Sequence, residues 1–471
     1  MKQRNKPAFR LPPGGLLALS LGGALLLTAC VSPTSRKEAT TAARFSLPEV
    51  RDVWAVAQDA VGEVQVGWID AFGDETLTAL VREAQENNRD LQVAAANVER
   101  SWALAGQAGA ALKPSVDVGV GGTRSGVVGD SSSSGSLDVT VHASWELDIW
   151  GRLRAGKQAA VVSAEAAEAD LRYAQHSLAA AVANAYFVAI EARIQANVTR
   201  DTFEALTETN RIVTVQYENG FASSQDLALS KSDLATAEAA LAAAEGSERD
   251  VLRALEVLLG RYPGADVQVR ESLPGVPAAP PAGVPSEILE RRPDLIAAER
   301  RVAAAFNSLD QARAARLPSI SLTAGAGASS NQLSSLLDPG NVAWSLGTNL
   351  LAPIFRGGAL KAQVEAATAE QEQTIAAYGQ AALSAFKEVE TSLDQNVVLS
   401  ERSASLTVAA EGANEALRVV QLRHREGEVE LLDVLTIQRR VFSAESNLLT
   451  VERARLEQWV NLNLALGGSW E

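Results

Sequence analysis

Two stretches of this chain read as copies of one another. Asp90 recurs as Asp294, and Pro114 recurs as Pro318, both at a shift of 204 residues. Three further pairs follow at a constant shift of 207: Gly220 and Gly427, Asp226 and Asp433, Glu238 and Glu445. A period of this length is too long for a solenoid repeat, so it indicates that a whole architectural unit is duplicated.

Each copy contains two runs in which apolar and polar residues alternate. The clearest run covers 139–149, where the odd positions are apolar and the even positions are polar or charged. Matching runs lie at 115–120, 319–324 and 342–355. Alternation over about ten residues is typical of a transmembrane β-strand. An amphipathic strand of a soluble sandwich gives the same pattern in a single run.

Four strands are too few to enclose a pore, because membrane barrels begin at about eight strands. If these strands cross a membrane, several chains must therefore combine them, and the sequence predicts a homo-oligomer. In such a barrel Glu146 and Asp148 would face the lumen, while Trp145 and Ile149 would face lipid.

A very long helix is predicted after each strand pair. Residues 152–218 contain no proline and glycine only at Gly156, and 358–426 are the counterpart. About 66 residues at 1.5 Å each give a helix of roughly 100 Å. A second helix then runs to Leu259 or to Leu466, which favours antiparallel coiled-coil hairpins. A single helix over 74–111, capped by Asp74, is predicted before the first strand pair.

The N-terminus has the pattern of a secretory signal peptide. Basic residues precede an apolar stretch, and small residues lead up to Cys30, which is the only cysteine in the chain. Leu27-Thr-Ala-Cys30 resembles a bacterial lipobox, which implies diacylglycerol and an N-acyl chain on Cys30. An incidental cysteine in a discarded leader is the alternative. The net charge of −15 argues against a nucleic-acid partner.

Four motifs resemble the TolC-like outer-membrane efflux channels, in particular their NodT-type lipoprotein branch. They are Trp145–Arg152, Glu290–Leu295, Arg316–Leu322 and Ala465–Gly468. The resemblance implies a mainly α, internally duplicated trimer with a 12-stranded membrane β-barrel and a helical periplasmic tunnel. It implies a passive exit duct, lipid-anchored in the outer membrane, that works with a periplasmic adaptor protein and an inner-membrane RND-type pump.

The same resemblance assigns roles to the turn in each hairpin. It implies that Asp226 and Asp433 form a pore constriction and that Arg423 and His424 close the tip. It also makes three residues candidates for adaptor docking, namely Gly220, Phe221 and Gly427. Simpler explanations exist for both sets. Acids near a helix N-terminus complement its dipole, and glycines permit a left-handed helix end.

The predicted organisation follows from these segments. A signal peptide (1–29) and a lipidated tether (30–66) precede the first repeat (67–265). A proline-rich linker (266–286) leads to the second repeat (287–471).

No catalytic motif or metal-ligand spacing is present, and the three histidines lie far apart in the sequence. We therefore predict neither enzymatic activity nor a cofactor other than the lipid. The alternative function is a lipid-anchored coiled-coil structural protein or adhesin without a pore. The sequence does not identify the exported substrate.

Overall fold

The computed structural model describes residues 36–47, 50–51, 53–55, 67–126, 128 and 133–470. The predicted signal peptide and Cys30 lie outside the described residues. The chain divides into two units. The strand unit comprises Leu112–Ala155 and Asp310–Leu360. The helical unit comprises the described residues of Ser35–Ala111, Gly156–Leu309 and Lys361–Glu471.

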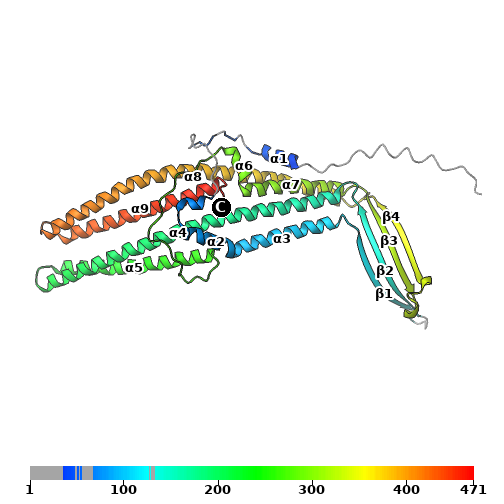
Figure 1. Cartoon of the computed structure of the whole chain (residues 1–471), viewed down its shortest axis with the longest axis horizontal. Helices are drawn as coiled ribbons and strands as arrows, with labels where there is room; N and C mark the ends of the chain where they lie inside the picture. The colour runs from blue at the N-terminus through cyan, green and yellow to red at the C-terminus, as the bar shows by residue number, and fades with distance from the viewer. Residues whose placement is uncertain are drawn as a thin grey trace, which may run out of the picture. The chain divides into compact units, whose positions relative to one another are not determined.

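The strand unit contains one antiparallel sheet with the strand order β1-β2-β3-β4 (Figure 1). Its strands are β1 (Ser115–Gly126), β2 (Ser133–Leu147), β3 (Ser319–Ser330) and β4 (Val342–Leu351). The prediction of two strands per repeat is confirmed, but two of the predicted runs were too long. After β2 the backbone turns at once, because the Ile149 amide donates to the Leu147 carbonyl at 2.9 Å.

The pairing register puts apolar side chains on one face of this sheet. Val118 lies opposite Val141, Val141 opposite Ala326, and Ala326 opposite Trp344. Val118 and Trp344 are 70% and 76% exposed, so this apolar face is uncovered within the chain. The other face carries small and polar residues, such as Gly119 opposite Thr140.

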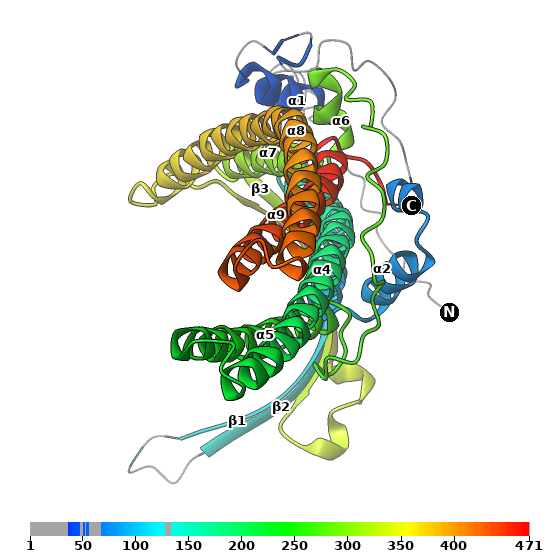
Figure 2. The ribbon, with the colours of Figure 1, turned by 90° about the vertical axis from the view of Figure 1, so that its left-hand side faces the viewer.

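Two helical hairpins dominate the helical unit and lie side by side (Figures 1 and 2). The first joins α4 (Arg152–Glu218) to α5 (Ser224–Leu258), and the second joins α8 (Ala359–Arg425) to α9 (Leu431–Ala465). The predicted long helices are confirmed almost to the residue. Both α4 and α8 have 67 residues, and both α5 and α9 have 35, so the shift of 207 holds throughout.

The predicted single helix over 74–111 was wrong, because it is divided into α2 (Glu75–Asn87) and α3 (Arg89–Ala110). Asn88 adopts an extended conformation between them. Its side chain accepts a hydrogen bond from the Leu91 amide at 3.0 Å, which caps α3, and donates to the Leu258 carbonyl at 2.9 Å. The Asn88 side chain therefore connects the beginning of α3 to the end of α5.

The space at this junction is tight. Gly260 follows α5 with φ of 76°, and a Cβ atom there would lie 2.5 Å from the carbonyl oxygen of Asn87. Any larger residue would force the two helix ends apart.

The second repeat has the same junction with different chemistry. Here α6 (Ile288–Arg291) is followed by Arg292 and α7 (Pro293–Ala314). Arg292 donates to the Ala465 carbonyl at 3.1 Å, just as Asn88 donates to Leu258. It also forms ion pairs with Asp294 at 2.8 Å and Glu388 at 2.7 Å. Burial alone would lower the pKa of Arg292, but the hydrogen bonds and charges of these carboxylates raise it above its usual range.

The main core of the helical unit surrounds the middle of α4. Tyr186, Phe187 and Ile190 are fully buried there. The Tyr186 hydroxyl donates to Asp74 at 3.0 Å, and Asp74 caps α2 as predicted. Among the described residues, α4 is the one helix long and apolar enough to cross a membrane by length and composition. With these side chains in the core, we interpret α4 as a core helix.

Several short elements complete the unit. They are α1 (Arg36–Phe45), η1 (Trp68–Phe72) and η2 (Pro285–Glu287), while η3 (Leu333–Ser335) and η4 (Pro339–Asn341) belong to the strand unit. The segment after α5 crosses the helices in irregular conformation. The Trp459 indole donates to Ala278 at 2.8 Å, and the Trp54 indole donates to Ala282 at 3.0 Å.

We predict that Arg292→Met destabilises the helical unit more than Asn88→Ala does. Removing the guanidinium leaves two carboxylates and a carbonyl without their partner, a loss of about 3 kcal/mol. Loss of the Asn88 cap should cost about 1 kcal/mol. Denaturant unfolding of both variants, followed by helical circular dichroism, measures the difference. Equal losses would contradict the unequal roles of the two junctions.

Candidate functional site

The turns of the two hairpins have the same backbone structure. At the first turn, Gly220 has φ of 79°, its amide donates to Tyr217 at 3.0 Å, and the Phe221 amide donates to Gln216 at 2.8 Å. This pair of hydrogen bonds is the Schellman motif. A Cβ atom at Gly220 would meet nothing within 4 Å, so the positive φ and not close packing requires glycine.

The second turn repeats this motif. Gly427 has φ of 78°, its amide donates to His424 at 3.0 Å, and the Glu428 amide donates to Arg423 at 3.0 Å. The predicted left-handed role of both glycines is confirmed.

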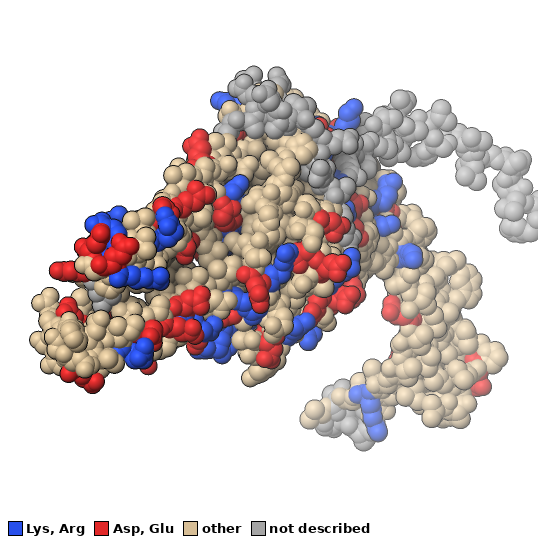
Figure 3. All heavy atoms as spheres, turned by 60° about the vertical axis from the view of Figure 1, so that its left-hand side comes forward, with Lys and Arg blue, Asp and Glu red and all other residues tan. Residues whose placement is uncertain are grey.

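The side chains of the two turns differ in charge. Acidic and basic side chains gather at the turn between α8 and α9, whereas the turn between α4 and α5 is mostly uncharged (Figure 3). Phe221 occupies the uncharged turn and is 85% exposed. The two turns therefore offer an apolar and a charged surface.

Asp226 is held by its own helix end. Ser223 and Asp226 form a capping box in which the Asp226 amide donates to the Ser223 hydroxyl oxygen at 3.1 Å. The Ser223 amide and hydroxyl donate to one Asp226 carboxylate oxygen at 2.9 and 2.7 Å. These hydrogen bonds lower the pKa of Asp226 below its usual value.

Asp433 occupies the equivalent position without this restraint. The residue equivalent to Ser223 is Glu430, whose side chain makes no capping hydrogen bond to α9. At the start of α9, the Asp433 amide donates to the Glu430 carbonyl at 3.2 Å. Asp433 is exposed.

Arg423 and His424 both bond across their own turn. The Arg423 guanidinium pairs with Glu428 at 3.1 Å, and Nδ1 of His424 lies 2.9 Å from the carbonyl oxygen of Val429. Arg423 and Glu428 are each about half exposed, so the pair is weakly held and open to other partners.

The two predicted lumen residues have different surroundings. Glu146 lies in β2 and receives two hydrogen bonds of 2.8 Å from Arg152. Asp148 lies beyond the end of β2, and its carboxylate accepts the Leu153 and Arg154 amides, each at 2.9 Å. Asp148 therefore caps the start of α4, with its side chain only 8% exposed.

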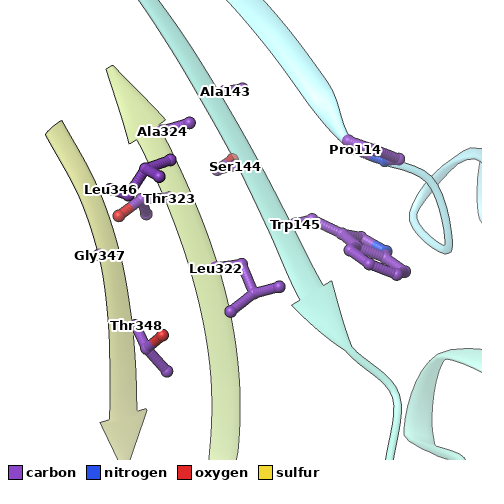
Figure 4. A pocket seen from close by; sticks show the side chains of 10 residues that line it. All are labelled: Pro114, Ala143, Ser144, Trp145, Leu322, Thr323, Ala324, Leu346, Gly347 and Thr348. Atoms are coloured by element: carbon purple, nitrogen blue, oxygen red, sulfur yellow. The ribbon is translucent and has the colours of Figure 1, made fainter. Parts of the chain in front are cut away.

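A shallow hollow marks the apolar face of the sheet (Figure 4). Ala143 lies opposite Ala324 at this hollow, and the larger Trp145, Leu322 and Leu346 border them. Its lining is mostly apolar and contains no charged residue. This surface suits hydrocarbon chains better than a polar ligand.

Sequence reasoning missed Ser223 and Glu428. Ser223 could have been found, since serine followed three residues later by an acid is the signature of a capping box. Glu428 gave no such signal, because a pair across a tight turn depends on the turn geometry. In the described part of the chain, no group of three or more His, Cys, Asp or Glu residues could hold a metal ion.

The fold and these turns define a duplicated protein of helical hairpins and a membrane-type sheet, and comparisons with known proteins identify its class. The sequence matches the family described as "Outer membrane efflux protein" over residues 80–261 and 284–468. The pyoverdine export outer membrane protein OpmQ of Pseudomonas aeruginosa is 31% identical over 96% of both chains. The probable outer membrane lipoprotein SilC of Salmonella typhimurium is 30% identical over 97% of this chain and 99% of SilC.

A solved structure agrees. The open state of the MtrE outer membrane channel of Neisseria gonorrhoeae has a TM-score of 0.80 and 30% identity, covering 90% of this chain and 97% of MtrE. The chain belongs to the outer membrane efflux protein family. It is the outer-membrane channel of an efflux system, as the resemblance predicted.

We predict that Ser223→Ala frees the first turn of α5 and raises the pKa of Asp226 toward its ordinary value. The folded-state pKa lies below the unfolded one. The stabilisation from the Asp226 carboxylate is therefore complete above the unfolded-state pKa and is lost as the pH falls through the folded-state pKa.

Hydrogen exchange at neutral pH should be slower in the first turn of α5 than in the first turn of α9. The Ser223→Ala variant should abolish this difference. Faster exchange in α5 of the unmodified protein would contradict this.

Proposed function

We propose that the protein works as a homotrimer in which three chains share one membrane barrel and one helical tunnel. The observation that carries this proposal is the sheet itself. Among the described residues it has four strands, and β1 and β4 each pair on one side only. In a membrane every backbone amide and carbonyl needs a partner, which open strand edges lack.

Joining β1 of one chain to β4 of the next removes both edges. Four strands cannot close a barrel alone, but twelve from three chains exceed the minimum of about eight. The number three comes from the family resemblance, whereas the need for several chains comes from the open edges.

The exposed apolar face supports a lipid-facing role for the outside of the barrel. Val116, Val120, Leu346 and Leu350 are 65–79% exposed on that face. Burial of apolar surface contributes about 25 cal/mol per Å², so such a face is stable in lipid and unfavourable in water. The opposite face, with Thr140, His142 and Glu146 on β2, would line the lumen.

The hairpins would form the periplasmic tunnel, with their turns at its far end. An adaptor protein would dock around Gly220, Phe221 and Gly427, where the exposed Phe221 offers an apolar contact. An inner-membrane RND-type pump would supply the energy, as the family resemblance implies.

A ring of carboxylates would then control the narrow end of the tunnel. Asp433 suits this role better than Asp226, because the Asp226 carboxylate is bound by Ser223. Asp433 from three chains would favour cations and repel anions. The Arg423–Glu428 pair would bias the second turn toward its closed conformation.

Substrates would be chosen by the pump and not by this duct. OpmQ is named for the export of pyoverdine, an example of a relative that exports an organic molecule. We propose that this protein also conducts small organic molecules.

A lipid anchor on Cys30 would hold the N-terminus in the outer membrane. SilC, named as a probable lipoprotein, supports this assignment. We predict that the mature chain begins at Cys30 and carries the mass of diacylglycerol and an acyl chain, and that Cys30→Ser removes both. Intact-mass spectrometry checks this; an unmodified wild-type cysteine would contradict it.

Planar-bilayer recording tests the channel. We expect conductance with a preference for cations, a loss of that preference in Asp433→Asn, and a smaller change in Asp226→Asn. Arg423→Ala should raise the open probability by releasing Glu428. Leu241→Gln, on α5 outside the turns, serves as a control.

Absence of conductance in the unmodified protein would favour the coiled-coil structural protein instead. Equal effects of the Asp226 and Asp433 variants would contradict the unequal roles of the two acids.

A further inference from the structure

The internal duplication shows how hairpins pack against one another. Within one chain, α9 of the second repeat packs against α4 of the first. Arg453 forms an ion pair with Glu191, and the Thr450 hydroxyl donates to Glu191 at 2.7 Å. Further along, the Asn184 amide donates to Asn461 at 3.1 Å. These contacts define the face that α4 uses to bind a neighbouring hairpin.

Within the described part of the chain, the equivalent face of α8 is exposed at these positions. Adding 207 to Asn184 and Glu191 gives Thr391 and Val398, and both are exposed. The Glu191 side chain is 19% exposed under α9, whereas Val398 is 37% exposed. The apolar Val398 is therefore exposed at the position where Glu191 of the first repeat contacts α9.

The matching face of α5 is made of small residues and is largely exposed. Subtracting 207 from Thr450, Arg453 and Asn461 gives Ala243, Gly246 and Ala254. Ala243 and Ala254 are exposed.

Gly246 lies in the interior of α5, where glycine costs about 1 kcal/mol relative to alanine. The described residues of the chain do not pack tightly against this glycine. A Cβ atom there would touch only Nη2 of Arg249, at 3.9 Å. Close approach of another backbone would supply the reason.

Charges at the next pair of positions are complementary. Phe187 of α4 and Leu456 of α9 belong to one buried cluster. Their equivalents are Asp394 on α8 and Arg249 on α5, which are both exposed and carry opposite charges. Neither forms an ion pair with any described residue of the same chain.

We propose that the α8 face of one copy, with Thr391, Asp394 and Val398, packs against the α5 face of a second copy, with Ala243, Gly246 and Arg249. This inference rests on the proposed shared channel and names its contact surface. Contacts within a chain (α9 on α4) and between chains (α5 on α8) would then alternate around the tunnel.

The two kinds of contact would differ in chemistry. Within a chain, Arg453 lies between Glu191 and Glu457. Between chains, Val398 would pack on the bare backbone at Gly246, with the Asp394–Arg249 pair beside it. Helices in contact lie about 8–10 Å apart, and small residues bring them to the lower end of that range.

Cysteine cross-linking tests the contact. A chain with Gly246→Cys and Val398→Cys, treated in detergent with a short bismaleimide, should give covalent dimers and trimers. Each single variant shows the background, to which an acylated Cys30 would contribute no free thiol. The matched control pairs Gly246→Cys with Val408→Cys. Val408 is 69% exposed, and its equivalent Asp201 is exposed within the chain, so this pair should give only background.

The outcomes separate this inference from the proposed function. Oligomers of the unmodified protein without cross-links, or cross-links confined to monomers, would overturn the contact and leave the shared channel standing. A monomeric unmodified protein in mild detergent would overturn both.

Charge reversal gives a second measurement that does not depend on cross-linker reach. Arg249→Asp and Asp394→Arg alone should each weaken oligomers about tenfold in the dissociation constant, and the double variant should restore most of the loss. Both positions are exposed in the chain, so the variants are expected to fold. Additive losses in the double variant would refute the pairing.

Discussion

The backbone amide and carbonyl groups at the two edges of the sheet are the main constraint on how this protein assembles. A strand edge in water can bond to solvent, but an edge in hydrocarbon cannot, and each unsatisfied group costs several kcal/mol. The four strands of the described residues leave two such edges without a partner strand. If several chains share one barrel and one tunnel, as proposed, the apolar face would contact lipid. The long helices and the duplicated hairpins would then form the tunnel.

The duplication has preserved backbone geometry more strictly than side-chain chemistry. Each helix junction receives one side-chain hydrogen bond at the same place, from Asn88 in one half and from Arg292 in the other. Each turn is closed by the same pair of backbone bonds around Gly220 or Gly427. Because the backbone is fixed, exchanging a neutral group for a charged one changes the strength of a junction without changing its shape.

Much of the fold could be predicted because its signals are periodic or steric. The absence of proline over 152–218 fixed the extent of α4, and the paired glycines marked both turns. The break at Asn88 was missed, since asparagine within a helical pattern is common and its role as a cap depends on the distant Leu258. Likewise, alternation placed Asp148 in a strand, whereas its carboxylate is used by two amides of α4.

The two hairpins differ in how their second helices begin. The first turn of α5 is held by the capping box of Ser223 and Asp226, whereas α9 begins after Glu430 without a side-chain cap. The first amides of a helix have no partner within the helix, so an uncapped helix start unwinds more readily than a capped one. Local unwinding would therefore begin at the start of α9, beside Asp433, while the start of α5 stays wound. The duplication thus leaves one hairpin with a rigid helix start and the other with a start that can rearrange.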